Sequence, residues 1–332
     1  MTTTSTAGQR FSPEVHRIAG TARRYVITCL TGEGIGPEVM AQASRALAAV
    51  SSLHGFAVEE VHPPFGAEAV IRSGQALPPG TQRAIAGADA VLLAGSSQPG
   101  LDSVQAELAP AAAVVTTQHG TGSGLTLFAA LTPDADDWAI ARAFSTARAR
   151  NGRIAAVGVD GPWLARVARH AAEHDGVAVA WPSLAEAMHL LRAAPGSLDV
   201  VVTQTVLLEA LVEVADLGSG RQPAATGLLS PTAPDLFFPT HGSARDIAGH
   251  GVANPTGMLL AAALLLAEGL ERRAAAQTLA GSVGAALQQP LGTPDRAASG
   301  SLASGTREFV DVVLGLLPGA RRDTEFALGG SG

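Results

Sequence analysis

The first structured stretch that the sequence predicts is a short apolar run, followed by a glycine-rich turn and a helix. RYVITCL (24–30) has the apolar and β-branched residues of a buried strand, TGEGIGPEV (31–39) carries the glycines, and residues 39–50 form an alanine-rich helical pattern. Further apolar runs, at 57–61 and 90–94, again alternate with stretches of helical pattern. This alternation of strands and helices constrains the chain to the α/β class.

A second glycine-rich segment, HGSARDIAGHGVAN (241–254), contains three glycines, an aspartate and two histidines, and an apolar helix is expected behind it near 258–268. Glycine lets a ligand lie against the backbone, and a loop that leads into a helix offers free N–H groups to phosphates. Asp246 can accept hydrogen bonds from ribose hydroxyls, as acidic residues do in other dinucleotide sites. On these residues alone, the segment is either a dinucleotide loop or an ordinary glycine-rich connection.

Both segments resemble loops of the isopropylmalate/isocitrate dehydrogenase family, the β-decarboxylating dehydrogenases. Residues 31–39 resemble the family's GDGIGPEV, and residues 241–254 resemble its adenosine-binding loop, with Arg245 where a proline is usual. In that family an Asp-Ile pair, here Asp246-Ile247, accompanies NAD, because a carboxylate binds the ribose 2′-hydroxyl and repels a 2′-phosphate. The resemblance implies a divergent member nearest the NAD-dependent isopropylmalate dehydrogenase branch. The NAD-binding residues that it implies are Glu33, Ile35, His241, Gly242, Ser243, Ala244, Asp246, Ile247, Ala253 and Asn254.

The resemblance extends over most of residues 24–317 and is weak between residues 99 and 150. DVVVTQTVLLEALVEVAD (199–216) resembles the family's metal-binding strand and helix, and SGTREFVDVVLGLL (304–317) resembles its C-terminal helix. It implies the isopropylmalate-dehydrogenase-like two-domain fold with a discontinuous first domain. We expect a flexible arm at 1–23, a first domain from 24–98 and 230–332 with the dinucleotide loops, and a second domain from 99–229 with the contact of a homodimer.

The family resemblance places two metal-binding carboxylates at Glu209 and Glu213. Residues four apart share one face of a helix, so both side chains could reach one Mg²⁺ or Mn²⁺ ion. Glutamate is one methylene longer than the aspartate that is usual there, and the family's third ligand, from the partner subunit, falls on Leu184, which cannot coordinate. The other reading of the glutamate pair is a solvated acidic face on a surface helix.

The groups that the family uses for decarboxylation are missing. The lysine position, in VDGPW, holds Gly161 beside Asp160, and the chain has no lysine, because all 22 of its Lys+Arg residues are arginines. Tyr25 is the one tyrosine and lies in the first strand, while Trp138, near the family's tyrosine position, cannot transfer a proton.

The family's arginine clamp for substrate carboxylates falls in an interval, between Arg83 and Arg142, that contains no arginine. That interval holds the polar loop TTQHGTGSG (116–124), whose His119 could serve as a new acid or base or could be an ordinary exposed loop residue. We therefore consider Asp160 and His119 as candidate catalytic residues. Loss of each acid or base should cost on the order of 10²–10⁴ in rate, so we expect no ordinary turnover of isopropylmalate or isocitrate.

The composition limits the kinds of binding partner and the cellular compartment that we expect for this protein. The net charge is −7 with no basic block, so we expect no nucleic-acid partner. The apolar run at 258–267 is shorter than the ~20 residues that span a bilayer, and residues 1–23 lack the apolar core of a signal peptide, so we expect no membrane association. The single cysteine, Cys29, fits a buried strand position and a reducing compartment, so we expect a cytoplasmic protein.

Three functional hypotheses follow from the sequence. The first is an NAD-dependent oxidoreductase whose chemistry has moved to another small-molecule substrate of unknown identity. The second is a non-catalytic relative that acts as an NAD-binding or protein-interaction homodimer. The third is a fold in which the 241–254 loop is kept only for its packing. An open polar cleft around Glu209 and His119 would favour an enzyme, and a cleft filled with apolar side chains would favour a scaffold.

Overall fold

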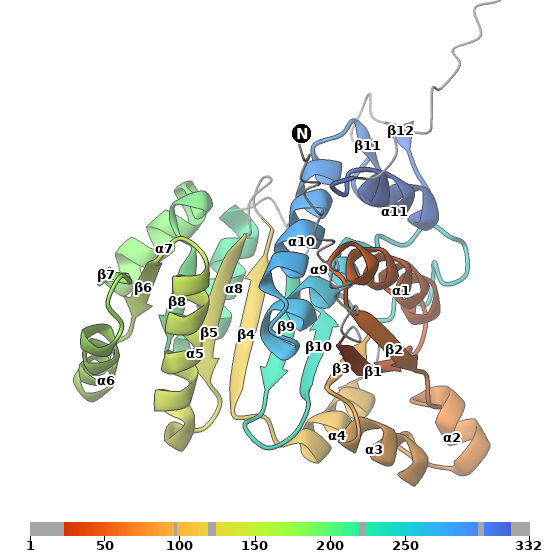
Figure 1. Cartoon of the computed structure of the whole chain (residues 1–332), viewed down its shortest axis with the longest axis horizontal. Coiled ribbons are helices and arrows are strands. Elements are labelled where there is room, and N and C mark those ends of the chain that lie inside the picture. The colour runs from red at the N-terminus through yellow and green to blue at the C-terminus, as the bar shows by residue number, and fades with distance from the viewer. Residues whose placement is uncertain (1–22, 96–97, 119–123, 219–223, 298–301, 320–332) are drawn as a thin grey trace, which may run out of the picture.

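One mixed sheet of ten strands runs through the computed structural model, which describes residues 23–95, 98–118, 124–218, 224–297 and 302–319 (Figure 1). In spatial order its strands are β2 (Ala57–Val61), β1 (Arg24–Leu30), β3 (Ala90–Leu93), β10 (Asp235–Pro239), β9 (Ala224–Leu229), β4 (Ala112–Thr117), β5 (Leu125–Ala130), β8 (Val200–Thr203), β6 (Arg153–Val157) and β7 (Ala178–Ala180). Helices cover both faces of the sheet, so the predicted α/β class is confirmed.

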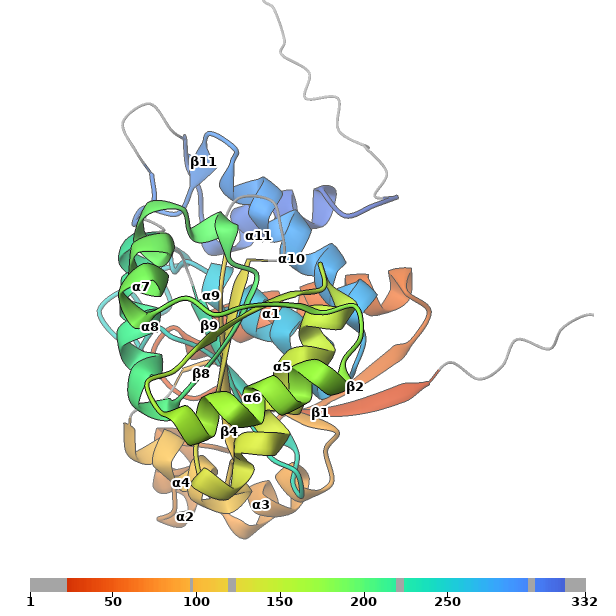
Figure 2. The same cartoon turned by 90° about the vertical axis from the view of Figure 1, so that its left-hand side faces the viewer.

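Each face of the sheet has its own apolar core, and Figure 2 shows the two helical layers on either side of the strands. The first layer consists of α1 (Gly36–Leu53), α5 (Asp136–Ala149), α6 (Gly161–Glu173), α9 (Thr256–Leu264) with the π-helical turn η3 (Leu265–Gly269), α10 (Arg273–Leu287) and α11 (Thr306–Gly315). The second consists of α3 (Pro79–Ala86), α4 (Gln98–Leu108), α7 (Leu184–Ala193) and α8 (Thr205–Gly218), with α2 (Ala67–Ser73) beside α3. The remaining elements are the short η1 (Pro133–Ala135) and η2 (Pro195–Ser197) and the strand pair β11 (Leu291–Gly292) and β12 (Leu302–Ala303).

The strands run in two directions, and this decides where their loops lie. β1, β2, β3 and β10 are parallel to one another, and β5, β8, β6 and β7 are parallel to one another. Three antiparallel pairings, β10 with β9, β9 with β4 and β4 with β5, reverse the direction between these sets. The carboxyl ends of β1, β3 and β10 therefore lie at one edge of the sheet, and those of β5, β8 and β6 lie at the opposite edge.

Several sequence-based elements coincide with the structure. The strands expected at 24–30 and 57–61 are β1 and β2, and the helix expected at 39–50 lies within α1. The apolar helix expected near 258–268 is α9 followed by η3, and it is buried along its whole length because it packs between the sheet and α1 and α10. Its apolar residues on every side are typical of such a central helix.

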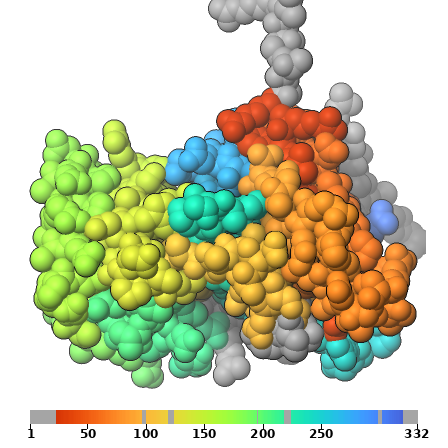
Figure 3. All heavy atoms as spheres, turned by 90° about the horizontal axis from the view of Figure 1, so that it is seen from below, coloured from red at the N-terminus to blue at the C-terminus, as the bar shows by residue number. Residues whose placement is uncertain are grey.

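The sheet is continuous across the two predicted domains. The boundary predicted at 229/230 falls in the turn between β9 and β10, which pair antiparallel. Figure 3 shows this turn, in teal, between the first part of the chain, in red and orange, and the second part, in yellow and green. The division at 24–98 with 230–332 and 99–229 stays a prediction, and residues 1–22 of the expected arm lie outside the described residues.

Within the described ranges, no helix combines the length and the apolar character needed to cross a bilayer.

Candidate functional site

The glycine-rich turn after β1 and the 241–254 loop are held against each other by backbone contacts. The amide of Ile35 donates a hydrogen bond to the carbonyl of Ser243 at 2.9 Å. Gly34 has φ +61°, and a Cβ at this position would lie 1.8 Å from the same carbonyl oxygen. Only glycine fits this conformation and this close approach, so the docking of the second loop requires the glycine at position 34.

A side-chain ion pair also joins the two loops. The carboxylate of Glu33 accepts from the guanidinium of Arg245, while the amide of Glu33 donates to Gly95 at 3.0 Å. Glu33 is largely buried by this contact, and Arg245 is exposed. Arg245, where the family usually has proline, therefore has its charge compensated within the protein.

Glu38, on the first turn of α1, fixes the far end of the 241–254 loop. Its carboxylate accepts hydrogen bonds from the amides of Gly249 and Ala253, both at 3.1 Å, and from the hydroxyl of Thr306 at 3.3 Å. Thr306 also donates to the carbonyl of Ala253 at 2.7 Å. Loop amides that have no partner in a helix or strand are satisfied in this way. The sequence interpretation did not identify Glu38, although it belongs to the same conspicuous PEV sequence.

A hollow of ≈ 290 Å³ opens between these loops, and four predicted cofactor residues line it. They are Ile35, His241, Ile247 and Asn254. Pro294 and Asp295 complete the wall from a segment forty residues further along the chain, and the Asn254 amide donates to Asp295 at 2.9 Å. These two residues belong to no motif, so the sequence analysis did not identify them.

His241 presents one ring nitrogen without a partner. Its Nδ1 lies 3.1 Å from the carbonyl of Gly242, and its buried Nε2 has no hydrogen-bond partner among the described residues. Burial lowers the pKa of His241, and the contact with Gly242 opposes that effect only in part. The imidazole is therefore neutral near pH 7, and with Nδ1–H donating to Gly242, Nε2 can accept a hydrogen bond.

The remaining predicted cofactor residues differ in their exposure and in the polar groups that are free to bind a ligand. Asp246 is exposed and has no hydrogen bond or ion pair among the described residues, so its carboxylate is available to a ligand. Gly242 is exposed, Ser243 and Ala244 are half-buried, and Ala244 adopts φ 36°. Ala253 is fully buried, and its amide and carbonyl are both bonded to protein groups, so it supports the loop from beneath.

The candidate catalytic and metal-binding residues belong to the other set of strands. Asp160 is exposed at the start of α6, after β6, and Glu209 and Glu213 are exposed on α8, after β8. The amide of Val159 donates to the side chain of Gln204 at 2.8 Å, so the Asp160 loop and the start of α8 are neighbours. These loops follow the opposite edge of the sheet from the dinucleotide loops. His119 lies outside the described residues.

The region in which the sequence lacks arginine is packed with apolar side chains. Ala113 of β4 and Ala129 of β5 are paired across the strands and buried. Leucine and valine side chains of α4 and α8 belong to the same core, namely Val104, Leu108, Leu208 and Leu211. The described side chains with which these helices pack onto the sheet are therefore apolar.

Within the described ranges, one group of three metal-ligating side chains lies close enough to hold an ion, and it does not include the glutamate pair. It consists of Cys29, Glu60 and His62, whose ligand atoms lie within 4.8 Å of one another. Burial raises the pKa of the Cys29 thiol far above its ordinary value, which disfavours the thiolate that binds metals. Cys29 is fully buried in the core, as the sequence predicted.

Comparison with known proteins gives a consistent result. The family model described as isocitrate/isopropylmalate dehydrogenase matches residues 26–135 and 163–313, so the interval with Asp160 lies outside the match. The chain is 31% identical over 358 residues to a 3-isopropylmalate dehydrogenase of Synechococcus sp. (strain CC9605), covering 88% of this chain and 99% of that protein. It is 30% identical to the chloroplastic 3-isopropylmalate dehydrogenase of Brassica napus, covering 88% of this chain and 87% of that protein.

Solved structures share the fold. A β-decarboxylating dehydrogenase from Thermococcus kodakarensis aligns with a TM-score of 0.75 at 22% identity, covering 88% of this chain and 96% of that one. An isocitrate dehydrogenase from Methylococcus capsulatus aligns with a TM-score of 0.70 at 21% identity, covering 88% and 99%. The predicted isopropylmalate-dehydrogenase-like fold is confirmed.

Proposed function

Because this chain belongs to the isocitrate/isopropylmalate dehydrogenase family, we propose that it is an NAD-binding oxidoreductase with altered substrate chemistry. Its adenosine site is the hollow between the 31–35 turn and the 241–254 loop. The observation that carries this proposal is that one loop presents an unpartnered Nε2 on His241 and an unpartnered carboxylate on Asp246, while two of its amides are bonded to Glu38. Unused polar groups at a rigid loop are suited to a ligand with hydroxyl and amine groups.

The preference for NAD over NADP follows from charge. The free carboxylate of Asp246 can accept from a ribose 2′-hydroxyl and would repel a 2′-phosphate. The neighbouring Arg245 could have offset that repulsion, but its guanidinium is paired with Glu33. Bound NAD would supply the hydride acceptor for oxidation of an alcohol, and the chain's own residues would hold the cofactor. Of the two candidates for taking up the hydroxyl proton, Asp160 follows a strand that ends at the edge opposite the dinucleotide loops, so His119 is the candidate that we retain.

Among the described residues, the glutamate pair has no further ligand that would complete a metal site. Glu209 and Glu213 are two exposed carboxylates on α8, and Leu184, the family's position for a ligand from the partner subunit, has no ligand atom. A Mg²⁺ or Mn²⁺ ion would need further ligands from a substrate or from other groups of a second subunit. No step of the proposed function depends on a metal.

Calorimetric titration of the purified protein with NAD and NADP tests the cofactor proposal. We expect NAD to bind and NADP to bind at least tenfold more weakly, and Asp246→Asn should weaken NAD about tenfold and reduce the discrimination. Asp175→Asn, at an exposed aspartate without a partner, is the matched control and should change neither affinity. Equal affinity for both cofactors, or an unchanged affinity in Asp246→Asn, would contradict the assignment.

The apolar side chains with which α4 and α8 pack onto the sheet favour a second candidate, a non-catalytic relative that binds NAD as a homodimer. The two candidates differ in turnover. Formation of NADH at 340 nm with a panel of 2-hydroxy acids would identify an oxidoreductase, whereas NAD binding without NADH formation would support the non-catalytic alternative. We also propose a small-molecule substrate of unknown identity for the first candidate, and a cytoplasmic location, which the single buried thiol of Cys29 supports.

A further inference from the structure

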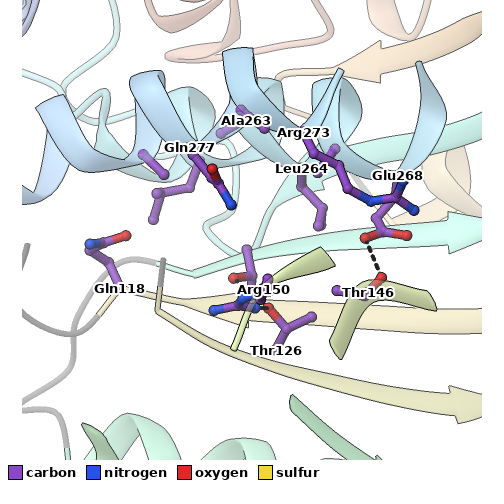
Figure 4. A pocket seen from close by; sticks show the side chains of 14 residues that line it. Gln118, Thr126, Thr146, Arg150, Ala263, Leu264, Glu268, Arg273 and Gln277 are labelled. Atoms are coloured by element: carbon purple, nitrogen blue, oxygen red, sulfur yellow. Dashed lines mark hydrogen bonds between the residues drawn. The ribbon is translucent and has the colours of Figure 1, made fainter. Parts of the chain in front are cut away.

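A second hollow, unrelated to the dinucleotide loops, lies on the first helical layer between α10 and α5. Its volume is ≈ 70 Å³, and strands β4 and β5 form its floor (Figure 4). One side belongs to α9 and α10 and the other to α5, so the cavity lies where the two predicted domains meet. By its volume it holds about five non-hydrogen atoms, at roughly 10–15 Å³ for each water-sized atom.

The wall on the side of α9 and α10 is mainly apolar, although the polar side chain of Gln277 also lines it. Leu260, Ala263 and Leu264 of α9 and Ala276 and Ala280 of α10 line it. The alanines leave the space that longer side chains would fill. A hydrocarbon group placed along this wall would be removed from water.

The floor carries a buried arginine with an unused donor. Arg150 is ion-paired with Asp199 at 2.6 Å and donates to the Thr126 hydroxyl at 2.8 Å and to the carbonyl of Gly124. Its side chain is only 10% exposed, and its buried Nε has no partner among the described residues. A buried charged donor without an acceptor is costly, so the site favours a ligand or a water that supplies one.

The lower end of the cavity carries an arginine without a carboxylate. Arg273 donates to the hydroxyl of Ser145 at 3.2 Å, forms no ion pair with the described acidic residues, and has a buried Nε without a partner. Figure 4 shows Arg273 and Glu268 at the same end, but Glu268 already accepts from Arg142 at 3.1 Å and from Thr146 at 2.8 Å. The charged residues that line the cavity are thus two arginines, each with a free N–H, and one glutamate whose two oxygens are engaged.

We propose that this cavity, which we call the α5–α10 cavity, binds a short aliphatic monocarboxylate, with its carboxylate at Arg273 and its carbon chain against α9 and α10. The planar guanidinium of Arg273 suits a carboxylate, which accepts several hydrogen bonds in one plane. A dianion is excluded by the engaged carboxylate of Glu268 at the same end, and a long chain is excluded by the volume. The occupant would contact α5 and α10 together and so bridge the two parts of the chain.

The test uses the sodium salts of acetate, propionate, butyrate and octanoate, with propionamide as a neutral probe, in saturation-transfer NMR and calorimetry on the full chain. We expect propionate and butyrate to bind one site with millimolar affinity and to saturate by about 100 mM. Acetate and octanoate should bind more weakly because they underfill or exceed the cavity. Propionamide should bind at least roughly tenfold more weakly because it lacks the charge that Arg273 receives.

Two variants locate the site, each with a control. Ala280→Leu fills the cavity and should abolish butyrate binding, whereas Ala274→Leu, at an exposed position of the same helix, should not. Arg273→Gln should weaken butyrate roughly tenfold, and Arg307→Gln, at an exposed arginine of α11, should leave it unchanged. Circular dichroism spectra that match the wild type show that each variant folds, and Arg273→Lys, which keeps the charge, should retain part of the affinity.

Butyrate that binds Ala280→Leu as tightly as the wild type would overturn the proposal, and so would the absence of saturable butyrate binding, which would mean that water fills the cavity. NAD should still bind in the presence of saturating butyrate, and Asp246→Asn should still bind butyrate. The proposal for the α5–α10 cavity and the proposal for the NAD site can therefore be contradicted independently of each other.

Discussion

The carboxylate of Glu38, on the first turn of α1, accepts a hydrogen bond from the amide of Ala253 at 3.1 Å, across 215 residues of sequence. The same carboxylate accepts from Gly249, so one side chain closes the 241–254 loop onto the helix that follows the first strand. Thr306, at the start of α11, joins the same cluster. Three segments that are distant in the sequence are thereby held in one arrangement before any cofactor binds.

Replacement of Glu38 should loosen this arrangement. Glu38→Ala leaves the amides of Gly249 and Ala253 without their acceptor, while the hydroxyl of Thr306 keeps the carbonyl of Ala253. Each such loss costs about 1–3 kcal/mol when the group stays buried. We expect a lower free energy of unfolding in urea. We also expect an NAD affinity at least tenfold weaker, because part of the binding free energy would be used to order the loop. Glu173→Ala, at an exposed glutamate of α6 without a partner, is the control. An unchanged NAD affinity in Glu38→Ala would show that the loop does not depend on this carboxylate.

Two glycines with similar φ angles allow the cost of backbone strain to be measured separately from the cost of a steric clash. Gly34 has φ +61° and faces the carbonyl of Ser243, whereas Gly74 has φ +75° and open space around its missing Cβ. Gly74→Ala should therefore cost only the conformational penalty, about 1 kcal/mol. Gly34→Ala adds a clash with backbone, and we expect a loss above about 3 kcal/mol together with loss of NAD binding. Urea unfolding of both variants measures the difference, and equal losses would mean that the two loops can separate at little cost.

The sequence predicted the first strand and helix well because their pattern is local. RYVITCL is a buried apolar run that ends at glycines, so these residues by themselves predict a strand. The residues of the hollow that belong to motifs, such as His241 and Asn254, were found for the same reason. Asp295 was missed because its position depends on the path of the chain after α10, which no short pattern specifies.

The direction of the strands was also invisible in the sequence. Three successive antiparallel pairings, β10 with β9, β9 with β4 and β4 with β5, send Asp160 to the edge opposite the dinucleotide loops, and only the assembled sheet shows this. The interval between Arg83 and Arg142 is a second case in which the sequence did not show the tertiary structure. Its lack of arginine was evident, but the apolar packing of α4 and α8 onto the sheet follows from tertiary structure.

Asp235 gives the protein a specific dependence on pH. Burial raises the pKa of Asp235 to about 6, although its carboxylate accepts from the amide of Ser230 at 2.9 Å and Arg142 lies near. The folded state therefore holds this proton more tightly than the unfolded chain, whose aspartates titrate near ~3.9. The contribution of Asp235 to stability is complete below about pH 4 and is lost as the pH rises through about 6.

Asp235→Asn removes this titration and keeps an oxygen for Ser230. The variant should be more stable than the wild type at pH 7, by at most about 3 kcal/mol, and the difference should vanish near pH 4. Urea unfolding at several pH values measures it, with Asp175→Asn as a control that should follow the wild type at every pH. A difference of the same size at pH 4 and pH 7 would show that packing, not the proton, accounts for the effect.

The exposed face of α8 is the surface on which we place the contact of a homodimer. Val206 is 77% exposed and Leu217 is 55% exposed, and with Glu209 and Glu213 they recur at helical spacing on one side of α8. Large apolar side chains on such a face are typical of a surface that a second subunit covers, and the partner would then also reach the glutamate pair.

Val206→Glu should weaken dimerisation at least about tenfold without lowering the stability of the subunit. Ile71→Glu, at an apolar residue of α2 that is 86% exposed, is the matched control and should leave the dimer intact. Light scattering after size exclusion, over a range of protein concentrations, measures the mass of each variant. A wild-type protein that stays monomeric throughout that range would rule out this dimer and with it any metal site shared through α8.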